Sequence, residues 1–154
     1  MPIIQLENVK KSYPLGKTLV PAIKGVSFSI EEGDFVSIIG PSGSGKSTIL
    51  NMIGCIDVPT DGKVIINGQE TSGLSDREIT TLRHDVIGFI FQSFNLLPVL
   101  NVYENIEFPF LIGRNKFTTR EKQEHKEYVN SLIEAVGLTR WTTHKPAELS
   151  GGQR

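Results

Sequence analysis

The segment Gly40–Ser47 combines the residue types and the spacing best suited to chemistry in this 154-residue sequence. It reads GPSGSGKS and matches the pattern G-x-x-x-x-G-K-[ST]. Glycines allow a backbone to curl so that several N–H groups point at one phosphate. Lys46 would then contact the terminal phosphate oxygens, and the Ser47 hydroxyl would bind Mg²⁺. The segment therefore predicts a site for a nucleotide polyphosphate and Mg²⁺.

Two predicted elements would position this loop. The run 35–39 before it is short and almost wholly apolar, which is typical of a strand covered on both faces. Apolar residues after the loop recur at helical spacing until Pro59, which cannot extend a helix. The helix that begins near Lys46 would direct its free N–H groups and positive dipole end at the phosphates. The residues expected around the phosphates are Gly40, Pro41, Ser42, Gly43, Ser44, Gly45, Lys46, Ser47 and Thr48.

Further strands and a helix are predicted on both sides of the loop. Apolar and polar residues alternate over 4–7 and 26–30, and 64–66 is a short apolar run between turns, so each predicts a strand. Ser75 and Glu78 have the spacing of a capping box, which predicts a helix after them. A second strand of the buried type is predicted over 86–91.

The chain after Gln92 has a helical character. Thr118 and Glu121 form a second capping box, and a long apolar face follows it. Gly137 is a natural C-terminal cap for that helix. Pro109 is expected to interrupt an earlier helix, because proline cannot donate the next hydrogen bond.

Composition and charge narrow the function classes. The chain has 16 basic and 17 acidic residues, whereas an extended nucleic-acid surface is clearly basic. No apolar run approaches the ~18–20 residues of a membrane-spanning helix. Cys55 is the only cysteine, which excludes an intrachain disulfide, and it is predicted to pack in the core. The three histidines have no metal-ligand spacing.

A second motif gives the sequence a family resemblance. Residues 149–153 read LSGGQ and follow the phosphate loop by about a hundred residues. Together the two motifs resemble the phosphate loop and signature sequence of ATP-binding cassette (ABC) ATPases, over residues 4–154. The resemblance implies ATP and Mg²⁺ as cofactors and a head-to-tail dimer with ATP at the interface. In that dimer, the ATP of one subunit would meet the partner's copies of Ser150, Gly151, Gly152 and Gln153.

The same resemblance implies roles for two further residues and one segment. Tyr13 matches the aromatic residue that stacks on adenine, although a lone tyrosine also serves packing. Gln92 matches the glutamine that reaches Mg²⁺ and the attacking water, its alternative being a strand-end amide bonded to backbone. The segment 93–98 resembles the part that meets a coupling helix of a membrane subunit. Its apolar residues, Phe94, Leu96 and Leu97, fit that contact and burial in the helical part equally well.

The expected fold class is α/β. The resemblance implies a P-loop NTPase core with an N-terminal antiparallel β subdomain in residues 1–92, and a helical signature subdomain in residues 93–154. Residues 89–105 and 51–57 resemble ATPases of the lipoprotein-release, macrolide-export and antimicrobial-peptide-resistance group. Such a subunit is expected to be cytoplasmic, held at the inner face of the membrane by transmembrane permease subunits, with no nucleic-acid partner.

The family pattern continues beyond the signature into a strand with a catalytic Glu and then a switch His. This sequence ends at Arg154, so we expect an N-terminal piece of that fold, without the C-terminal part of the core, which binds ATP without hydrolysing it. The leading hypothesis is an ATP-binding subunit of a transporter. The alternatives are a catalytically inactive nucleotide-binding fragment, an ABC protein that acts on nucleic acid, and a kinase or GTPase, which leaves residues 149–153 unexplained.

Overall fold

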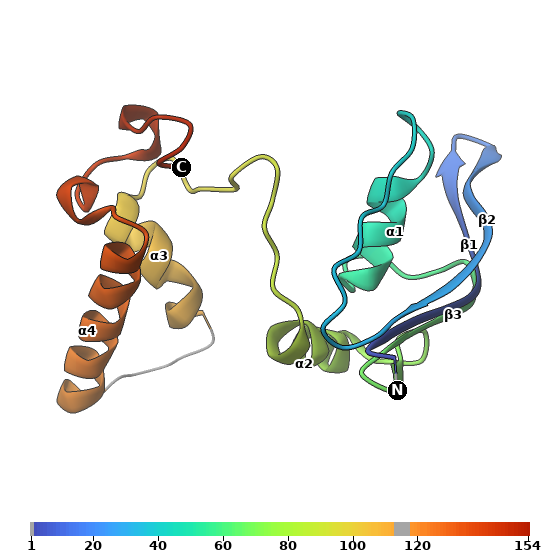
Figure 1. Ribbon diagram of the computed structural model, residues 1–154, viewed down its shortest axis with the longest axis horizontal. Coiled ribbons are helices and arrows are strands. Elements are labelled where there is room, and N and C mark those ends of the chain that lie inside the picture. Colours follow the sequence, from blue (N-terminus) through green and yellow to red (C-terminus); the bar gives the residue numbers. More distant parts are fainter. Residues whose placement is uncertain (1, 113–117) are drawn as a thin grey trace. The chain divides into compact units, whose positions relative to one another are not determined.

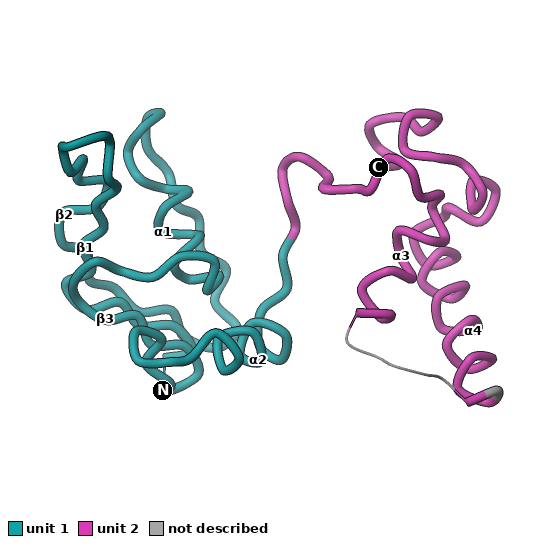
Figure 2. The backbone as a smooth tube through the Cα atoms, turned by 180° about the vertical axis from the view of Figure 1, so that it is seen from behind, with its two compact units in different colours: residues 1–89 teal, residues 90–154 magenta. Residues whose placement is uncertain are grey.

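The computed structural model describes residues 2–112 and 118–154. The chain divides into two compact units, residues 1–89 and residues 90–154 (Figure 2). The described strands all lie in the first unit, with helices α1 and α2. Helices α3 and α4 lie in the second unit, with two short 3₁₀ helices.

The first unit is built on an antiparallel sheet. Its strands are β1 (Ile4–Leu15), β2 (Thr18–Ile30), β3 (Asp61–Ile66) and β4 (Gln69–Glu70), in the order β2-β1-β3-β4. Leu6 of β1 is opposite Phe28 on one side and Val64 on the other, so alternate residues of β1 face the core. The predicted antiparallel β subdomain is therefore confirmed.

Two helices belong to the same unit. Helix α1 (Lys46–Ile53) lies beside the sheet in Figure 1 and buries Ile49 and Met52. Helix α2 (Asp76–Val86) begins with the predicted capping box, in which Ser75 N–H donates to a Glu78 carboxylate oxygen at 2.8 Å. The buried core of this unit comprises Leu6, Val9, Ile23, Ile49, Met52, Cys55, Val64, Ile66 and Leu82.

Two of the predicted strands are wrong. Residues 35–39 have no regular secondary structure, and in the run 86–91 residue 86 ends α2 while 87–91 are irregular. Phe35 and Ile90 are fully exposed. A strand exists only where a neighbouring backbone pairs with it, and no described strand pairs with either segment. Both apolar runs have the composition of covered strands but lack the pairing that would make them so.

The second unit is helical. Helices α3 (Val102–Leu111) and α4 (Thr119–Ala135) precede the 3₁₀ helices η1 (Thr139–Trp141) and η2 (Pro146–Glu148). The predicted capping box of Thr118 and Glu121 opens α4, and Gly137, with φ 73°, follows its end as predicted. Pro109 does not interrupt α3 where predicted, since the helix continues to Leu111. It lies in the last turn, where a missing N–H costs one terminal hydrogen bond.

Among the described residues of the second unit, the buried apolar side chains are Val102, Val129, Ile133, Pro146 and Leu149. No helix in the described ranges is both long enough and apolar enough to cross a bilayer.

Candidate nucleotide-binding site

The loop 40–45 leads directly into α1. Gly45 occupies the position before the helix with φ 91°, and Gly43 has φ 78°, both in the left-handed region that glycine adopts without strain. No side chain caps the start of α1. Its first N–H groups therefore have no side-chain partner, and an anion placed there would accept hydrogen bonds from them.

Close packing against β2 explains why position 45 is glycine. A Cβ atom at Gly45 would lie 2.4 Å from Cδ1 of Ile23 and 3.0 Å from the carbonyl oxygen of Ala22. At Gly40, a Cβ atom would lie 2.8 Å from Oγ of Ser44. The loop is therefore held against β2 at Gly45, and at Gly40 it folds back until an added Cβ would touch the Ser44 side chain.

A concave pocket of about 260 Å³ lies at the end of this loop. Six of the predicted phosphate-binding residues line it, and Ala22 of β2 completes the lining. The six are Ser42, Gly43, Gly45, Lys46, Ser47 and Thr48. Gly40, Pro41 and Ser44 lie in the same loop outside the lining. The sequence carried no sign of Ala22, because its place depends on how β2 returns past the loop.

Lys46 is bonded to its own loop. Its Nζ donates hydrogen bonds to the carbonyl oxygens of Gly40 at 2.9 Å and Pro41 at 2.7 Å. Both contacts are exposed to solvent, so they can be exchanged for phosphate oxygens at little cost in free energy. The ammonium is thus kept beside the pocket that Lys46 and Ser47 line.

The pocket offers a cation few protein ligands. In residues 2–112 and 118–154, no group of three or more His, Cys, Asp or Glu side chains could hold a metal ion. Mg²⁺ is commonly held by one or two protein ligands together with phosphate oxygens and water. Ser47 lines the pocket next to Lys46, so a residue with a hydroxyl oxygen is available for such a site.

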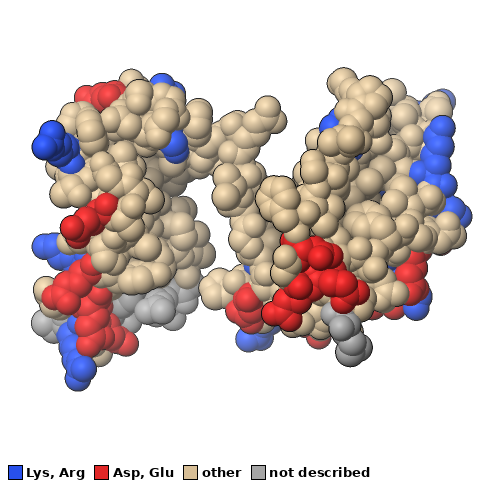
Figure 3. Space-filling view, viewed as in Figure 1, with Lys and Arg blue, Asp and Glu red and all other residues tan. Residues whose placement is uncertain are grey.

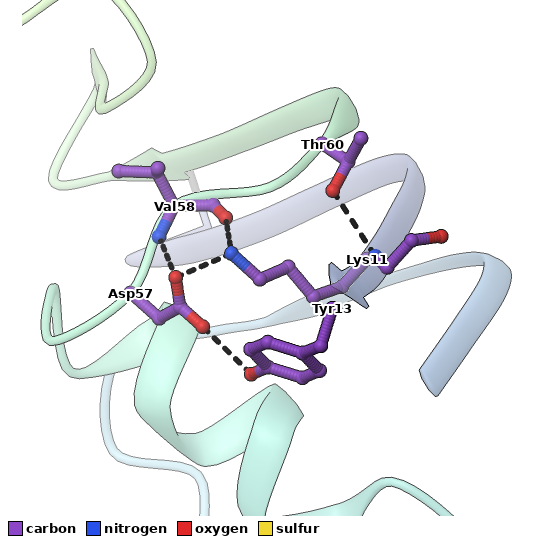
Figure 4. A network of polar contacts seen from close by, with 6 residues as sticks. Lys11, Tyr13, Asp57, Val58 and Thr60 are labelled. Carbon is purple, nitrogen blue, oxygen red and sulfur yellow. Dashed lines mark hydrogen bonds and ion pairs between the residues drawn. The ribbon is translucent and has the colours of Figure 1, made fainter. Parts of the chain in front are cut away.

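Tyr13 lies near the end of β1 in the same unit as the loop. Its hydroxyl donates to Oδ2 of Asp57 at 2.7 Å (Figure 4), and the residue as a whole is 38% exposed. The hydrogen bond to Asp57 raises the pKa of the Tyr13 phenol, burial adds to the rise, and the Thr48 hydroxyl opposes it. The phenol therefore stays protonated at neutral pH and lies close to the first turn of α1.

The register of the sheet relates Tyr13 to the pocket. Lys11 of β1 is opposite Ile23 of β2, the residue that packs on Gly45. Tyr13 is two residues further along β1, opposite Val20, and Ala22 of the pocket lies between these pairs. The β1–β2 ladder thus brings a half-exposed aromatic ring and the phosphate loop to the same end of the unit.

The remaining predicted site residues belong to the second unit. Gln92 is exposed in an irregular segment. Gly151 and Gly152 are exposed in a turn, and the Ser150 N–H and hydroxyl both donate to the side-chain oxygen of Gln153 at 2.9 Å. These residues lie in a different unit from the phosphate loop.

The three apolar residues of the segment 93–98 differ in how far they are buried. Phe94 and Leu97 are exposed, and the Arg154 guanidinium lies 5.9 Å from the centre of the Phe94 ring. Leu96 is half-buried and lines a mainly apolar cavity of about 360 Å³ together with Val102 and Leu149. One of the three apolar residues therefore packs within the helical unit, and two face solvent.

Comparisons with known proteins agree with one another. A family model described as "ABC transporter" matches residues 23–154. The ABC transporter ATP-binding protein MJ0796 of Methanocaldococcus jannaschii is 47% identical over 152 residues, which cover 99% of this chain and 64% of that protein. The macrolide export ATP-binding/permease protein MacB of Bdellovibrio bacteriovorus is 43% identical, with 99% of this chain and 22% of that protein covered.

Solved structures give the same result. The dimeric MJ0796 cassette in a post-hydrolysis state, bound to ADP and Pi, has a TM-score of 0.83 and 45% identity with this chain. The match covers 97% of this chain and 64% of the other. The chain thus spans 64% of the length of MJ0796, and a smaller share of the MacB protein.

Proposed function

Since the chain belongs to the ATP-binding cassette (ABC) transporter family and has the fold of its ATPase domains, we propose that it binds Mg-ATP as part of a transporter subunit. One observation carries this proposal. The uncapped start of α1, the glycine loop and Lys46 converge on one pocket, and that arrangement suits a polyphosphate.

The proposal assigns roles to most of the predicted site residues. Backbone N–H groups of 42–48 hold the β-phosphate, Lys46 contacts β- and γ-phosphate oxygens, and Ser47 binds Mg²⁺. The ring of Tyr13 stacks on adenine, for which its exposed surface and its place on the β1–β2 ladder give support. Gln92 would reach Mg²⁺ and the attacking water, a role that rests on the family resemblance.

Residues 1–154 by themselves are proposed to bind ATP without hydrolysing it. Besides the water-orienting role proposed for Gln92, hydrolysis in the family pattern uses a carboxylate and an imidazole beside the γ-phosphate. The described lining of the phosphate pocket consists of small side chains, hydroxyls and one ammonium, with neither a carboxylate nor an imidazole among them. ATP hydrolysis is therefore proposed for the whole family member, coupled to export or extraction of a substrate by a membrane partner.

Two protein partners complete the proposal. A second ATPase subunit would pair head to tail, with its Ser150–Gln153 facing the ATP held here. Two dimeric structures of the relative MJ0796 support the pairing of two subunits. Transmembrane permease subunits would hold the ATPase at the inner face of the membrane. The MacB relative is named as a combined ATP-binding and permease protein, and the exposed Phe94 and Leu97 offer apolar surface for such a contact.

Charge gives little support to a nucleic-acid partner. The formal net charge is -1. On the face shown in Figure 3, a run of basic side chains lies along the right-hand edge of the first unit, and acidic side chains gather in a large group of their own. A duplex-binding protein would carry a clear excess of basic over acidic side chains.

Calorimetric titration of the chain with ATP, with and without Mg²⁺, tests the proposal. We expect saturable binding that Mg²⁺ strengthens and that Lys46→Ala abolishes. Lys17→Ala removes an exposed lysine from the turn between β1 and β2 and should leave binding unchanged. Absence of binding, or equal binding by the Lys46→Ala variant, would contradict the proposed phosphate site.

A further inference from the structure

We propose that Asp57 and Lys11 are positioning residues, which fix the ring of Tyr13 as the platform for a nucleotide base. The proposal rests on the proposed function, because it assumes that the phosphate loop holds a nucleoside triphosphate. It adds two residues that no phosphate motif contains, and gives them the task of holding the Tyr13 ring already proposed to stack on adenine.

Asp57 is the centre of a polar network (Figure 4). Its Oδ2 accepts from the Tyr13 hydroxyl at 2.7 Å, and its Oδ1 accepts from Lys11 Nζ at 2.5 Å. Lys11 Nζ also donates to the carbonyl oxygen of Val58 at 2.7 Å, and the Val58 N–H donates to Oδ1 of Asp57 at 2.8 Å. Each carboxylate oxygen is thus bonded, and the Tyr13 hydroxyl has a fixed charged partner.

The Lys11–Asp57 ion pair is shielded from solvent more than the neighbouring Lys10–Asp61 pair. The side chains of Lys11 and Asp57 are 12% and 23% exposed, whereas those of Lys10 and Asp61 are 45% and 61% exposed. Solvent screens an exposed ion pair until it contributes little, and a shielded, charge-assisted hydrogen bond holds geometry better. Lys10 and Asp61 therefore provide a matched pair one residue away that does not contact Tyr13.

The network restrains the ring in two ways. The hydrogen bond to Asp57 fixes the far end of the side chain, which has only two rotatable bonds before the ring is oriented. Lys11 Nζ lies over the ring, 5.0 Å from its centre, and occupies one face by a cation–π contact. A base must stack on the face that the ammonium leaves free, so the network selects the stacking face.

Asp57 is attached to the helix of the phosphate loop. The N–H groups of Ile56 and Asp57 donate to the carbonyl oxygen of Asn51 in α1, at 2.9 and 3.2 Å. The start of α1 carries Lys46 and Ser47, and its eight residues span about 12 Å. One rigid helix therefore connects the phosphate end of the site to the anchor of the base platform.

The charge state of Asp57 suits this role. Burial would raise the pKa of its carboxyl, but hydrogen bonds from Lys11 and Tyr13 outweigh burial and hold the pKa below its ordinary value. The carboxylate is consequently ionised at neutral pH and accepts from both partners at once. Ser12, which lies between Lys11 and Tyr13 in β1, is held to the segment 57–60 by a hydrogen bond from its N–H to the Thr60 hydroxyl at 3.1 Å.

The test compares a ligand that has a base with one that lacks it. The chain is titrated with Mg-ATP and with Mg-tripolyphosphate, for the wild type, Asp57→Ala, Asp57→Asn and the control Asp61→Ala. Asp57→Ala should weaken ATP binding roughly fivefold or more, the lower range for loss of stacking of one base, and leave tripolyphosphate affinity unchanged. Asp57→Asn should fall between, because its amide oxygen still accepts from Tyr13. Asp61→Ala should affect neither ligand.

A double-mutant cycle separates positioning from a general structural role. If Asp57 acts through the Tyr13 hydroxyl, Tyr13→Phe weakens ATP binding in the wild type and adds nothing in the Asp57→Ala background. Equal weakening of ATP and tripolyphosphate by Asp57→Ala, or additive losses in the double variant, would overturn the proposal.

A readout without nucleotide tests the contact itself. The absorbance of tyrosinate is followed against pH, and the Tyr13→Phe variant identifies the contribution of Tyr13. Asp57→Ala should lower the pKa of the Tyr13 phenol, and an unchanged titration would overturn the proposal even if no nucleotide binds. Wild-type affinities that are equal for ATP and tripolyphosphate would also overturn the base platform but leave the phosphate site standing. If Lys46→Ala left the affinities for ATP and for tripolyphosphate unchanged, the proposed function itself would be refuted.

Discussion

The Lys46 ammonium lies 2.7 Å from the carbonyl oxygen of Pro41, within the loop that it is proposed to serve. The lysine therefore stabilises the loop in the absence of ligand, by two exposed hydrogen bonds that together contribute about 1 kcal/mol or less. Binding of a phosphate would exchange these carbonyl contacts for stronger, charge-assisted ones. The two roles of Lys46 can be measured separately.

We predict that Lys46→Met lowers the free energy of unfolding of the ligand-free chain by no more than about 1 kcal/mol, because its contacts are exposed. The same variant should lose the rise in melting temperature that Mg-ATP gives the wild type, since only ligand bound to the folded state raises it. Thermal unfolding with and without Mg-ATP measures both effects. A large loss of stability without ligand would mean that Lys46 holds the fold.

Gly45→Ala should destabilise the chain by about 1–3 kcal/mol, the range for a strained backbone conformation. The position combines φ 91° with a Cβ that would lie 2.4 Å from Ile23. Gly152→Ala is the control, because a Cβ there meets nothing within 4 Å. Adding Ile23→Ala to Gly45→Ala removes the clashing methyl group, so the stability cost of Gly45→Ala should be smaller in an Ile23→Ala background. Chemical denaturation of the wild type and of these four variants measures the costs.

Met52→Ala should cost about 2–5 kcal/mol of unfolding free energy, as for other fully buried side chains. Met52 is buried between α1 and the sheet, whereas Leu50 of the same helix is exposed. Leu50→Ala should therefore change stability by about 0.5 kcal/mol or less. Similar costs for the two variants would contradict the packing of α1 described here.

The contribution of Asp57 to stability should depend on pH. Its pKa is lowered on folding, so its stabilising effect is present above the pKa of the unfolded chain, about 4, and is lost as pH falls through the folded value. The difference in unfolding free energy between wild type and Asp57→Asn should thus be constant near neutral pH and shrink under acid conditions. Denaturation over a pH series checks this. A difference in unfolding free energy that grows in acid would contradict a lowered pKa of Asp57 in the folded chain.

Phe35→Ser and Ile90→Ser should leave the free energy of unfolding of this chain unchanged within about 0.5 kcal/mol, because both side chains are fully exposed. The substitutions should also raise the concentration at which the chain aggregates, since each removes apolar surface from an unpaired segment. Light scattering measures aggregation. A marked loss of stability would mean that these side chains are packed.

Features that depend on a few adjacent residues were predicted correctly from the sequence. The family resemblance is confirmed, and it was carried by two motifs of eight and five consecutive residues. The capping boxes at Ser75 and Thr118 are also correct, because such a box involves only four adjacent residues.

Features that depend on distant pairing were missed or wrong. The runs 35–39 and 86–91 have the composition of buried strands, but composition does not supply the neighbouring backbone that a strand needs. Nothing in the sequence marked Asp57 as a site residue, because the Tyr13 hydroxyl that it binds is 44 residues away in the sequence. Ala22 lines the pocket because β2 runs back past the phosphate loop, which the sequence did not predict. The assignments of Tyr13, Gln92 and Ser150–Gln153 to a nucleotide remain predictions.

The starts of the four described α-helices differ in one respect. Helices α2, α3 and α4 each open with a side chain that accepts a backbone N–H, and with a Glu that bonds back in return. Helix α1 opens with Gly45 and has no such side chain. Three helices therefore satisfy part of their own first turn, whereas the first N–H groups of α1 are left to solvent or to the proposed phosphate ligand. The open cap is in this sense what sets the proposed binding helix apart from the three helices whose caps are filled by side chains.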